Sequence, residues 1–337
     1  METAMTLELF GSNASPYSRK LRAILRYRRI AHVWKRCVPA MAPEFADVRP
    51  KLMPMLRDTD TGQHWLDSTP MAHALEQLHE GRSILPPNEG DRFVCHLLED
   101  MADEWVTKLM FHFRWIDDET AQQSAAWIID DTLAGLAPAV RSGLISQIHD
   151  RQRSRMDLVG VGPANAAVIR ADFTALLAAL RPLAENGSWL FGTRPSLADF
   201  GLYGQLSQLV KDSLPRRQVL AEALAVESWV TVLDDASGVD GEWAPESALA
   251  LAARQALLHM AARSYLPFLV ANAAALENGE AEFTVVIDGQ PFCQAPFAYQ
   301  AKCWREIVQR WNALPESERN RLVLVLAEAG CLTFLSE

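Results

Sequence analysis

The segment from residue 6 to residue 38 contains a strand pattern, a helix pattern and a second strand pattern, and this order restricts the fold more than any other feature. Thr6–Phe10 alternates apolar and polar residues, as a half-buried strand does. Pro16 suits the first turn of a helix, and an amphipathic run follows it. Residues 31–38 resemble a second strand. A helix between two strands predicts that the strands are parallel.

The next segment predicts a hairpin and a helix. Residues 52–56 and 63–66 have strand patterns, and a turn cluster at 58–62 separates them. A helix then begins at Ser68 or Thr69 and runs to about residue 79. With a helix expected between the second and third strands, the order is βαβαββα. The stretch LPPNEG, residues 85–90, closes this unit as a linker.

Beyond residue 90 the pattern is helical almost throughout. We expect helices at 92–113, 124–150, 163–185, 196–210, 216–234, 245–276, 298–314 and 316–329. Residues 282–294 predict a β-hairpin around Asp288-Gly289. Ser196 and Asp199 form a capping box, which we assign to folding. The predicted class is therefore α/β plus all-α.

Composition and charge exclude several classes of function. The 337 residues are 49% hydrophobic and 22% charged, with a net charge of −10 that should repel nucleic acid. We find no apolar run long enough to span a membrane and no secretory leader, and the five cysteines show no CxxC pair. We expect a cytoplasmic protein with reduced thiols, no membrane or nucleic-acid partner, and no metal.

The N-terminal 36 residues are locally basic, with eight lysines and arginines against two glutamates. This cluster is either a solvated helix face or an electropositive rim that attracts a small anion.

Four motifs, in order and spacing, resemble the cytosolic glutathione transferases. They are SPYSRKLR after the first strand, Met53-Pro54 before the third, Asp67-Ser68 at a helix start, and SLADF within the helical half. The resemblance covers about residues 5–235 and is nearest to bacterial, tau-like or theta-like members with an active-site serine. It implies a thioredoxin-like glutathione-binding domain over 1–83, an all-helical domain over 90–235 and a homodimer. Residues 240–337 form a mainly helical extension that the resemblance does not cover.

The resemblance also implies a glutathione site. It makes the Met53–Pro54 bond cis, which turns the Met53 backbone toward the tripeptide as another strand would be turned. Ser68 and Thr69, at a helix N-terminus, would take the γ-glutamyl carboxylate, and Asp67 its ammonium. Lys35, with Arg36 beside it, could reach the glycyl carboxylate. The reading that Ser68 only caps its helix stays open.

Ser15-Pro16-Tyr17-Ser18 has the frame of a dithiol redox motif without its sulfurs. A serine hydroxyl at a helix N-terminus can stabilise the thiolate of glutathione, whereas a cysteine there would form a mixed disulfide. This favours Ser15 as the catalytic residue for conjugation. Ser12 and Asn13 are alternates, and Ser15 as a plain N-cap is a further reading.

We expect an apolar electrophile pocket between the domains, with Tyr17, Trp105, Phe111, Phe113 and Trp115 as candidates. The predicted function is a glutathione transferase acting on a small hydrophobic electrophile. The alternatives are a non-catalytic protein that binds glutathione or a partner, and a glutathione-dependent isomerase or ether-cleaving enzyme. The extension could be a lid, a dimer contact or a docking surface.

Overall fold

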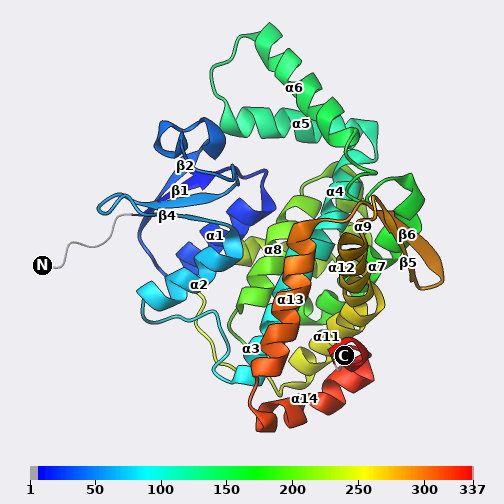
Figure 1. The fold of residues 1–337 in the computed structure, drawn as a ribbon. Helices are drawn as coiled ribbons and strands as arrows, with labels where there is room; N and C mark the ends of the chain where they lie inside the picture. The colour runs from blue at the N-terminus through cyan, green and yellow to red at the C-terminus, as the bar shows by residue number, and fades with distance from the viewer. Residues whose placement is uncertain (1–6, 336–337) are drawn as a thin grey trace, which may run out of the picture.

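The computed structural model describes residues 7–335 and sets a small sheet domain beside a larger helical part (Figure 1). The sheet domain consists of β1 (Leu7–Gly11), α1 (Pro16–Tyr27), β2 (His32–Arg36), β3 (Met55–Asp58), β4 (His64–Leu66) and α2 (Ser68–Leu78). The strand order is β2-β1-β3-β4, with β1 parallel to β2 and both other pairings antiparallel. The predicted parallel pair and hairpin are confirmed. Thr6, the expected first residue of the first strand, lies outside the described residues.

The two faces of the sheet are covered differently. Leu7, Leu9 and Leu56 pack against apolar residues of α1 and α2. On the opposite face, Phe10 meets the ring of Phe45 edge-on, with ring centroids 4.8 Å apart. The alternation of β1 therefore buries both faces, as a thioredoxin-like domain requires.

The helix expected between the second and third strands is absent from the described chain. Two one-turn 3₁₀ helices, η1 (Pro39–Met41) and η2 (Pro43–Phe45), stand in its place. Prolines recur in this connection, and each removes an N–H group that an α-helix would need. The segment therefore covers one face of the sheet with short turns.

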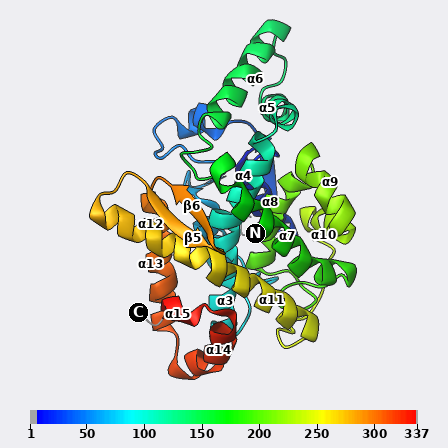
Figure 2. The same ribbon diagram turned by 90° about the vertical axis from the view of Figure 1, so that its right-hand side faces the viewer.

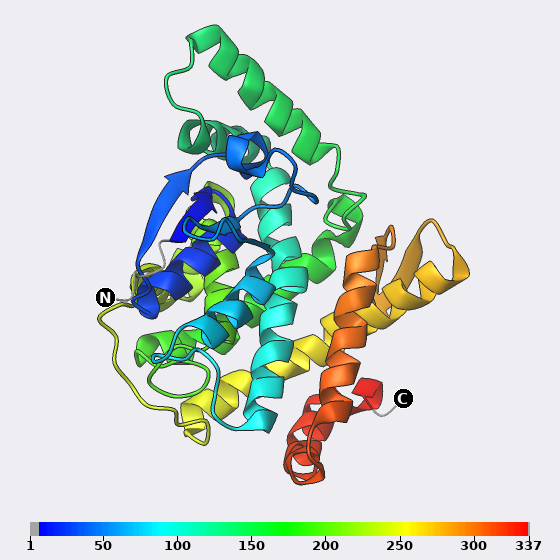
Figure 3. The same cartoon turned by 60° about the vertical axis from the view of Figure 1, so that its left-hand side comes forward.

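The helical part begins with one long central helix made of α3 (Glu89–Met101), the π-helical turn η3 (Ala102–Val106) and α4 (Thr107–Trp115) (Figure 3). The helices that follow are α5 (Asp118–Thr132), α6 (Pro138–Arg153), the 3₁₀ turn η4 (Pro163–Asn165), α7 (Ala166–Glu185), α8 (Leu197–Leu209), α9 (Ser213–Glu222) and α10 (Leu224–Asp234). None of the described helices combines the length and apolar character needed to cross a membrane.

Two of the expected helices are wrong in extent. Residues 124–150 were expected as one helix, but the chain breaks between α5 and α6 at Gly135, which has a φ of 75°, and restarts at Pro138. The second helix then projects away from the body of the molecule (Figure 1). Residues 216–234 likewise divide into α9 and α10 at Ala223. The positive φ at Gly135 explains the first of these breaks, because this conformation favours glycine and ends a right-handed helix.

The extension folds back onto the helical part. It comprises α11 (Ala248–Met260), the π-helical turn η5 (Ala261–Tyr265), α12 (Leu266–Asn278), β5 (Phe283–Ile287), β6 (Gln290–Gln294), α13 (Ala298–Ala313), α14 (Glu316–Ala329) and α15 (Leu332–Leu335). Asp288 and Gly289 both have positive φ, as the tight turn of a two-residue hairpin requires, so the predicted hairpin is confirmed. Figure 2 shows α11 and α12 running as one long rod beside α7.

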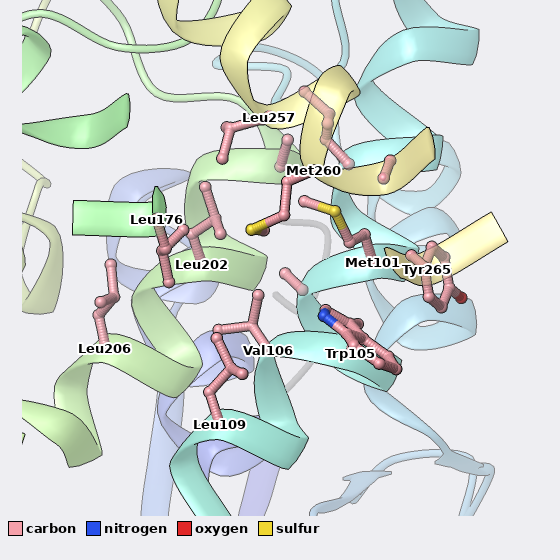
Figure 4. Packing of buried hydrophobic residues seen from close by; sticks show 14 of the residues in the cluster. Met101, Trp105, Val106, Leu109, Leu176, Leu202, Leu206, Leu257, Met260 and Tyr265 are labelled. Atoms are coloured by element: carbon pink, nitrogen blue, oxygen red, sulfur yellow. The ribbon is translucent and has the colours of Figure 1, made fainter. Parts of the chain in front are cut away.

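The buried side chains of the described part of the extension belong to the same hydrophobic cluster as those of the central helix. Leu257, Met260 and Tyr265 lie next to Met101 and Trp105 of the central helix (Figure 4). The extension is therefore fixed against the helix that runs past the sheet domain.

The start of α8 carries the predicted capping box. The Asp199 N–H donates to Ser196 Oγ (3.4 Å), and the Ser196 N–H donates to Asp199 Oδ2 (2.8 Å). The Leu190 N–H also donates to Asp199 Oδ1 (3.0 Å), and both capping side chains are fully buried. The box therefore fixes the preceding loop as well as the helix.

Replacing Ser196 with alanine should lower the free energy of unfolding by about 1–2 kcal/mol, because a buried helix start loses its cap. Urea unfolding of Ser196→Ala measures this loss. Ser247→Ala, which removes the more exposed cap of α11, is the matched control and should cost less. A smaller loss for Ser196→Ala than for this control would contradict the structural role.

Candidate functional site

A cavity of about 440 Å³ lies at the N-terminus of α2, where the sheet domain meets the central helix. We call it the α2 cavity. Its walls are Tyr17, Pro50, Leu52, Met53, Asp67, Ser68, Asp103, Glu104 and Tyr299. The cavity thus gathers residues from the sheet domain, the central helix and the extension, and its size is that of a small-molecule site.

The predicted dipeptide motifs meet in this cavity. The Met53–Pro54 bond is cis, as predicted. Asp67 is the N-cap of α2 and accepts a hydrogen bond from the Thr69 N–H (3.3 Å). Its φ of 70° is unfavourable for a non-glycine residue, and such backbone strain is concentrated at ligand sites. Ser68 is buried, and its hydroxyl has no hydrogen-bond partner among residues 7–335.

The extension reaches the same point. Tyr299, in the first turn of α13, donates a 2.6 Å hydrogen bond to Asp67 Oδ2. Burial, together with this bond to Asp67, raises the pKa of the Tyr299 phenol far above its usual range. The extension therefore supplies Tyr299 to the wall of the α2 cavity, and this residue contacts Asp67.

The loop before α1 is held by an acid of the helical part. Asp131 of α5 accepts from Ser12 Oγ (2.8 Å), the Asn13 N–H (2.6 Å) and Asn13 Nδ2 (2.7 Å). Ser12 and Asn13, the two alternates for the catalytic position, therefore both donate their hydrogen bonds to the Asp131 carboxylate. Ser15 differs, since its hydroxyl accepts from the Ser18 N–H (3.3 Å) and donates to no group within the described chain.

A second clamp holds the same loop from behind. The buried Arg114 donates to the Ala14 carbonyl oxygen (3.1 Å) and to Asp212 Oδ2 (2.7 Å). Gln208 Nε2 donates to the Asn13 carbonyl oxygen (3.2 Å). The helical part thus fixes the backbone in front of Ser15. Ser15 itself is not one of the residues lining the α2 cavity, although Tyr17, two residues later, is.

A buried lysine connects the helices around the cavity. Lys20 Nζ of α1 contacts Glu99, Asp103 Oδ2 (2.6 Å) and Thr69 Oγ1 (3.1 Å). Burial alone would lower the pKa of the Lys20 ammonium, but Asp103 and Glu99 outweigh it and raise the pKa. The Thr69 hydroxyl belongs to this cluster, so its side chain is directed away from the α2 cavity.

A second cavity of about 410 Å³ adjoins the first, and we call it the α4 cavity. It is lined by Glu104, Thr107, Lys108, Phe111, Gln152, Arg155, Val159, Val161, Phe297, Tyr299 and Gln300. Of the predicted electrophile residues, Phe111 lies here and Tyr17 lies in the α2 cavity. Trp105, Phe113 and Trp115 are instead buried in the core, and the Trp105 indole donates to Asp172 Oδ2 (2.7 Å).

A third, polar cavity lies between α2, α3 and α13, and we call it the α13 cavity. Glu104 and Tyr299 line all three cavities. Sequence reasoning missed both residues, as it missed Asp103 and Asp131. The spacing of Glu104, Thr107, Lys108 and Phe111 is that of one helix face, which was the available signal for the α4 cavity.

The acids on this stretch are shielded from water. Burial, aided by the neighbouring Asp100 and Asp103 carboxylates, raises the pKa of Glu104 to about 8. Burial also raises the pKa of Asp100, which accepts a 2.6 Å bond from Tyr265, to about 7. Burial lowers the pKa of Lys108 to about 7. The pKa values of the carboxyl groups on this stretch are therefore raised into the neutral range.

Lys35 is not brought to the α2 cavity. Its ammonium lies 2.5 Å from Glu8 Oε1 and 3.8 Å from Glu44 Oε1, on the sheet face opposite α1 and α2. Within residues 7–335, no group of three or more His, Cys, Asp or Glu side chains is arranged to hold a metal ion.

Residues 9–83 match the family profile described as the glutathione S-transferase N-terminal domain. The match concerns the sheet domain, which contains Asp67, Ser68 and the cis Met53–Pro54 bond. No curated protein matches the sequence.

Several solved structures are similar over about two thirds of the chain. A glutathione S-transferase from Methylobacterium radiotolerans, solved with glutathione sulfonate, is 18% identical and covers 69% of this chain and 94% of its own, with a TM-score of 0.44. One from Ceriporiopsis subvermispora, solved with glutathione, is 16% identical and covers 69% and 98%, with a TM-score of 0.45. A beta-etherase from Sphingobium is 17% identical and covers 68% and 95%, with a TM-score of 0.42.

Replacing Asp100 with asparagine should stabilise the protein more at pH 8 than at pH 5. The pKa of Asp100 is raised from 3.8 to about 7 on folding, so wild-type stability falls between these values as the unfolded chain releases a proton that the folded chain retains. Asparagine does not titrate and can still accept the Tyr265 bond. Melting temperatures of both proteins at the two pH values measure the difference. A gap that does not widen with pH would show that the buried acid is not protonated.

Proposed function

We propose that this protein is a glutathione transferase that binds glutathione in the α2 cavity and a small apolar electrophile in the α4 cavity. The observation that carries the proposal is a pair of adjoining cavities. One contains Asp67, Ser68 and Met53 of the segment that matches the glutathione S-transferase profile, and the other has the apolar side chains of Phe111, Val159, Val161 and Phe297 beside polar ones. The proposed units are a glutathione-binding domain over 1–83, a helical domain over 90–235 and an extension over 240–337. A homodimer, which rests on the resemblance, and a cytoplasmic location, which rests on the cysteine pattern, also belong to the proposal.

The ends of the tripeptide match the polar walls of the α2 cavity. Ser68 and the N-terminus of α2 offer N–H and O–H donors to the γ-glutamyl carboxylate, in the favourable field of the helix dipole. Asp67 offers its carboxylate to the γ-glutamyl ammonium while it keeps its bond to Tyr299. The Met53 backbone offers strand-like pairing to the extended peptide. Lys35 could take the glycyl carboxylate only after leaving Glu8.

Ser15 is the proposed donor to the glutathione sulfur. Its hydroxyl proton is uncommitted among the described residues, whereas the Ser12 hydroxyl and the Asn13 side-chain amide both donate to Asp131. A hydrogen bond from Ser15 and the N-terminus of α1 both favour the thiolate over the thiol. The thiolate then attacks the electrophile in the α4 cavity. In this account the protein supplies an oxygen donor and a dipole, and the substrate supplies the sulfur.

Ser15→Ala should lower kcat with chlorodinitrobenzene by at least about tenfold, because the lost bond matters most to the charged sulfur. Affinity for glutathione, measured by calorimetry, should change little. Ser247→Ala is the matched control, since it removes the N-cap of α11, a residue that lines none of the three cavities. An unchanged rate for Ser15→Ala would move the role to another residue. Glutathione binding by the wild type without turnover of several electrophiles would favour a non-catalytic binding protein.

Asp67→Asn should weaken glutathione binding by about tenfold or more, because a charge-assisted bond to the ammonium is lost. Asparagine keeps the shape of the side chain and tolerates the positive φ at this position. Calorimetric titration with glutathione measures the effect. Asp117→Asn, at the N-cap of α5, is the control and should bind as the wild type does. Equal affinities for Asp67→Asn and the wild type would refute the assignment of Asp67.

A further inference from the structure

Glu104 lies where the proposed glutathione and electrophile sites meet. Its side chain lines the α2 cavity with Tyr17, Met53 and Asp67, and it also lines the α4 cavity with Phe111. A group at this position faces both reactants. The inference below rests on the proposed function, because it needs the sulfur in one cavity and the electrophile in the other.

The backbone presents Glu104 to the cavities through an unusual turn. The central helix widens into the π-helical segment η3 over Ala102–Val106, and such segments inside α-helices often occur at functional sites. The turn directs Trp105 into the core, where it packs on Phe268 and Phe292. Glu104, next to it, is directed to the cavity side.

The Glu104 carboxyl makes few interactions with the rest of the described chain. Gln300 Nε2 donates to Glu104 Oε2 at 3.3 Å, and this is its side chain's one hydrogen bond within residues 7–335. Lys108, one helical turn later, donates hydrogen bonds from Nζ to the Val159 carbonyl oxygen (3.0 Å) and to Gln294. The carboxyl is therefore neither paired with a nearby cation nor needed for a cap, and its Oε1 accepts no hydrogen bond within residues 7–335.

The groups around Glu104 favour its protonated form. The acidic residues Asp100 and Asp103 lie on the same helix as Glu104 and interact with it. The phenols of Tyr17, Tyr265 and Tyr299, which come from α1, η5 and α13, also interact with it. The other titratable or charged groups facing it are Cys303 of α13, Asp67 beyond Tyr299, Lys108, and Arg155 on the far wall of the α4 cavity. Burial and the acidic neighbours outweigh the cations, so the pKa of Glu104 rises to about 8.

We infer that Glu104 is the general acid of a conjugate addition of glutathione to apolar α,β-unsaturated carbonyl compounds. Glutathione loses its thiol proton to solvent, and its sulfur forms a bond to the β-carbon. The electron pair of the C=C bond moves toward the carbonyl, and the carbonyl oxygen takes the proton of Glu104. The enol then becomes the ketone by proton exchange with water, and the Glu104 carboxylate recovers a proton from water. The sum is glutathione plus enone giving one adduct, with no other reactant.

Two substrates separate this role from a purely structural one. Benzylideneacetone develops negative charge on oxygen as sulfur adds, whereas chlorodinitrobenzene expels chloride, which needs no proton. Glu104→Gln keeps the size of the side chain and can keep its contact with Gln300, but cannot donate an acidic proton. It should lower kcat/KM for benzylideneacetone about 100-fold more than for chlorodinitrobenzene. Glu306→Gln, at an acid that lines the α13 cavity but neither the α2 nor the α4 cavity, is the matched control and should leave the ratio of the two rates unchanged.

The pH dependence gives a second readout. In the wild type, the ratio of the benzylideneacetone rate to the chlorodinitrobenzene rate should fall as pH rises through about 8, because Glu104 loses its proton. Thiolate formation affects both rates and cancels in the ratio. In Glu104→Gln the ratio should not depend on pH.

Equal losses on both substrates in a folded Glu104→Gln, or a wild-type ratio that does not change with pH, would overturn the inference and leave the proposed function intact. Absence of glutathione binding by the wild type would overturn both. Circular dichroism and melting temperature establish that each variant is folded.

Discussion

The arrangement of the site depends on one buried ammonium group. Lys20 is fully buried and contacts Glu99, Asp103 and Thr69, which belong to the central helix and α2, while Lys20 itself belongs to α1. Ser15 and Asp67 are the N-caps of α1 and α2, and Glu104 lies on the central helix. Removing one partner of such a buried cluster leaves uncompensated charge and typically costs about 3–5 kcal/mol. The lysine therefore couples the positions of the sulfur donor, the peptide-binding residues and the proposed acid.

The helical part and the extension supply the residues that complete the site next to the sheet domain. Asp131 and Arg114 hold the loop before α1 from two sides, and the Ser15 hydroxyl proton at the end of this loop bonds to no group of the described chain. The extension packs into the core of the central helix and places Tyr299 against Asp67. The site is thus assembled from parts of the chain more than 200 residues apart, and each part restricts the space left for a ligand.

Local motifs were predictable, whereas their long-range partners were not. The parallel strand pair, the hairpin at 282–294 and the capping box of Ser196 follow from neighbouring residues, so sequence patterns found them. Trp105 was assigned to the pocket because a helix apolar on most sides has no distinct outer face, and η3 then shifts the helical phase at this residue. The contact of Tyr299 with Asp67 has no local signal. Several of the basic N-terminal residues proved to pair with specific acids, Arg19 and Arg26 with Asp234 among them, which neither interpretation of that cluster had anticipated.

The central claim is that the protein holds the sulfur of glutathione in its charged form. The direct test is a pH titration of the ultraviolet thiolate absorbance of glutathione bound to the wild-type protein, compared with glutathione free in solution. The account predicts that the bound thiol ionises at a distinctly lower pH than the free thiol, whose pKa is about 8.5. Bound glutathione that titrates with the same pKa as free glutathione would contradict it.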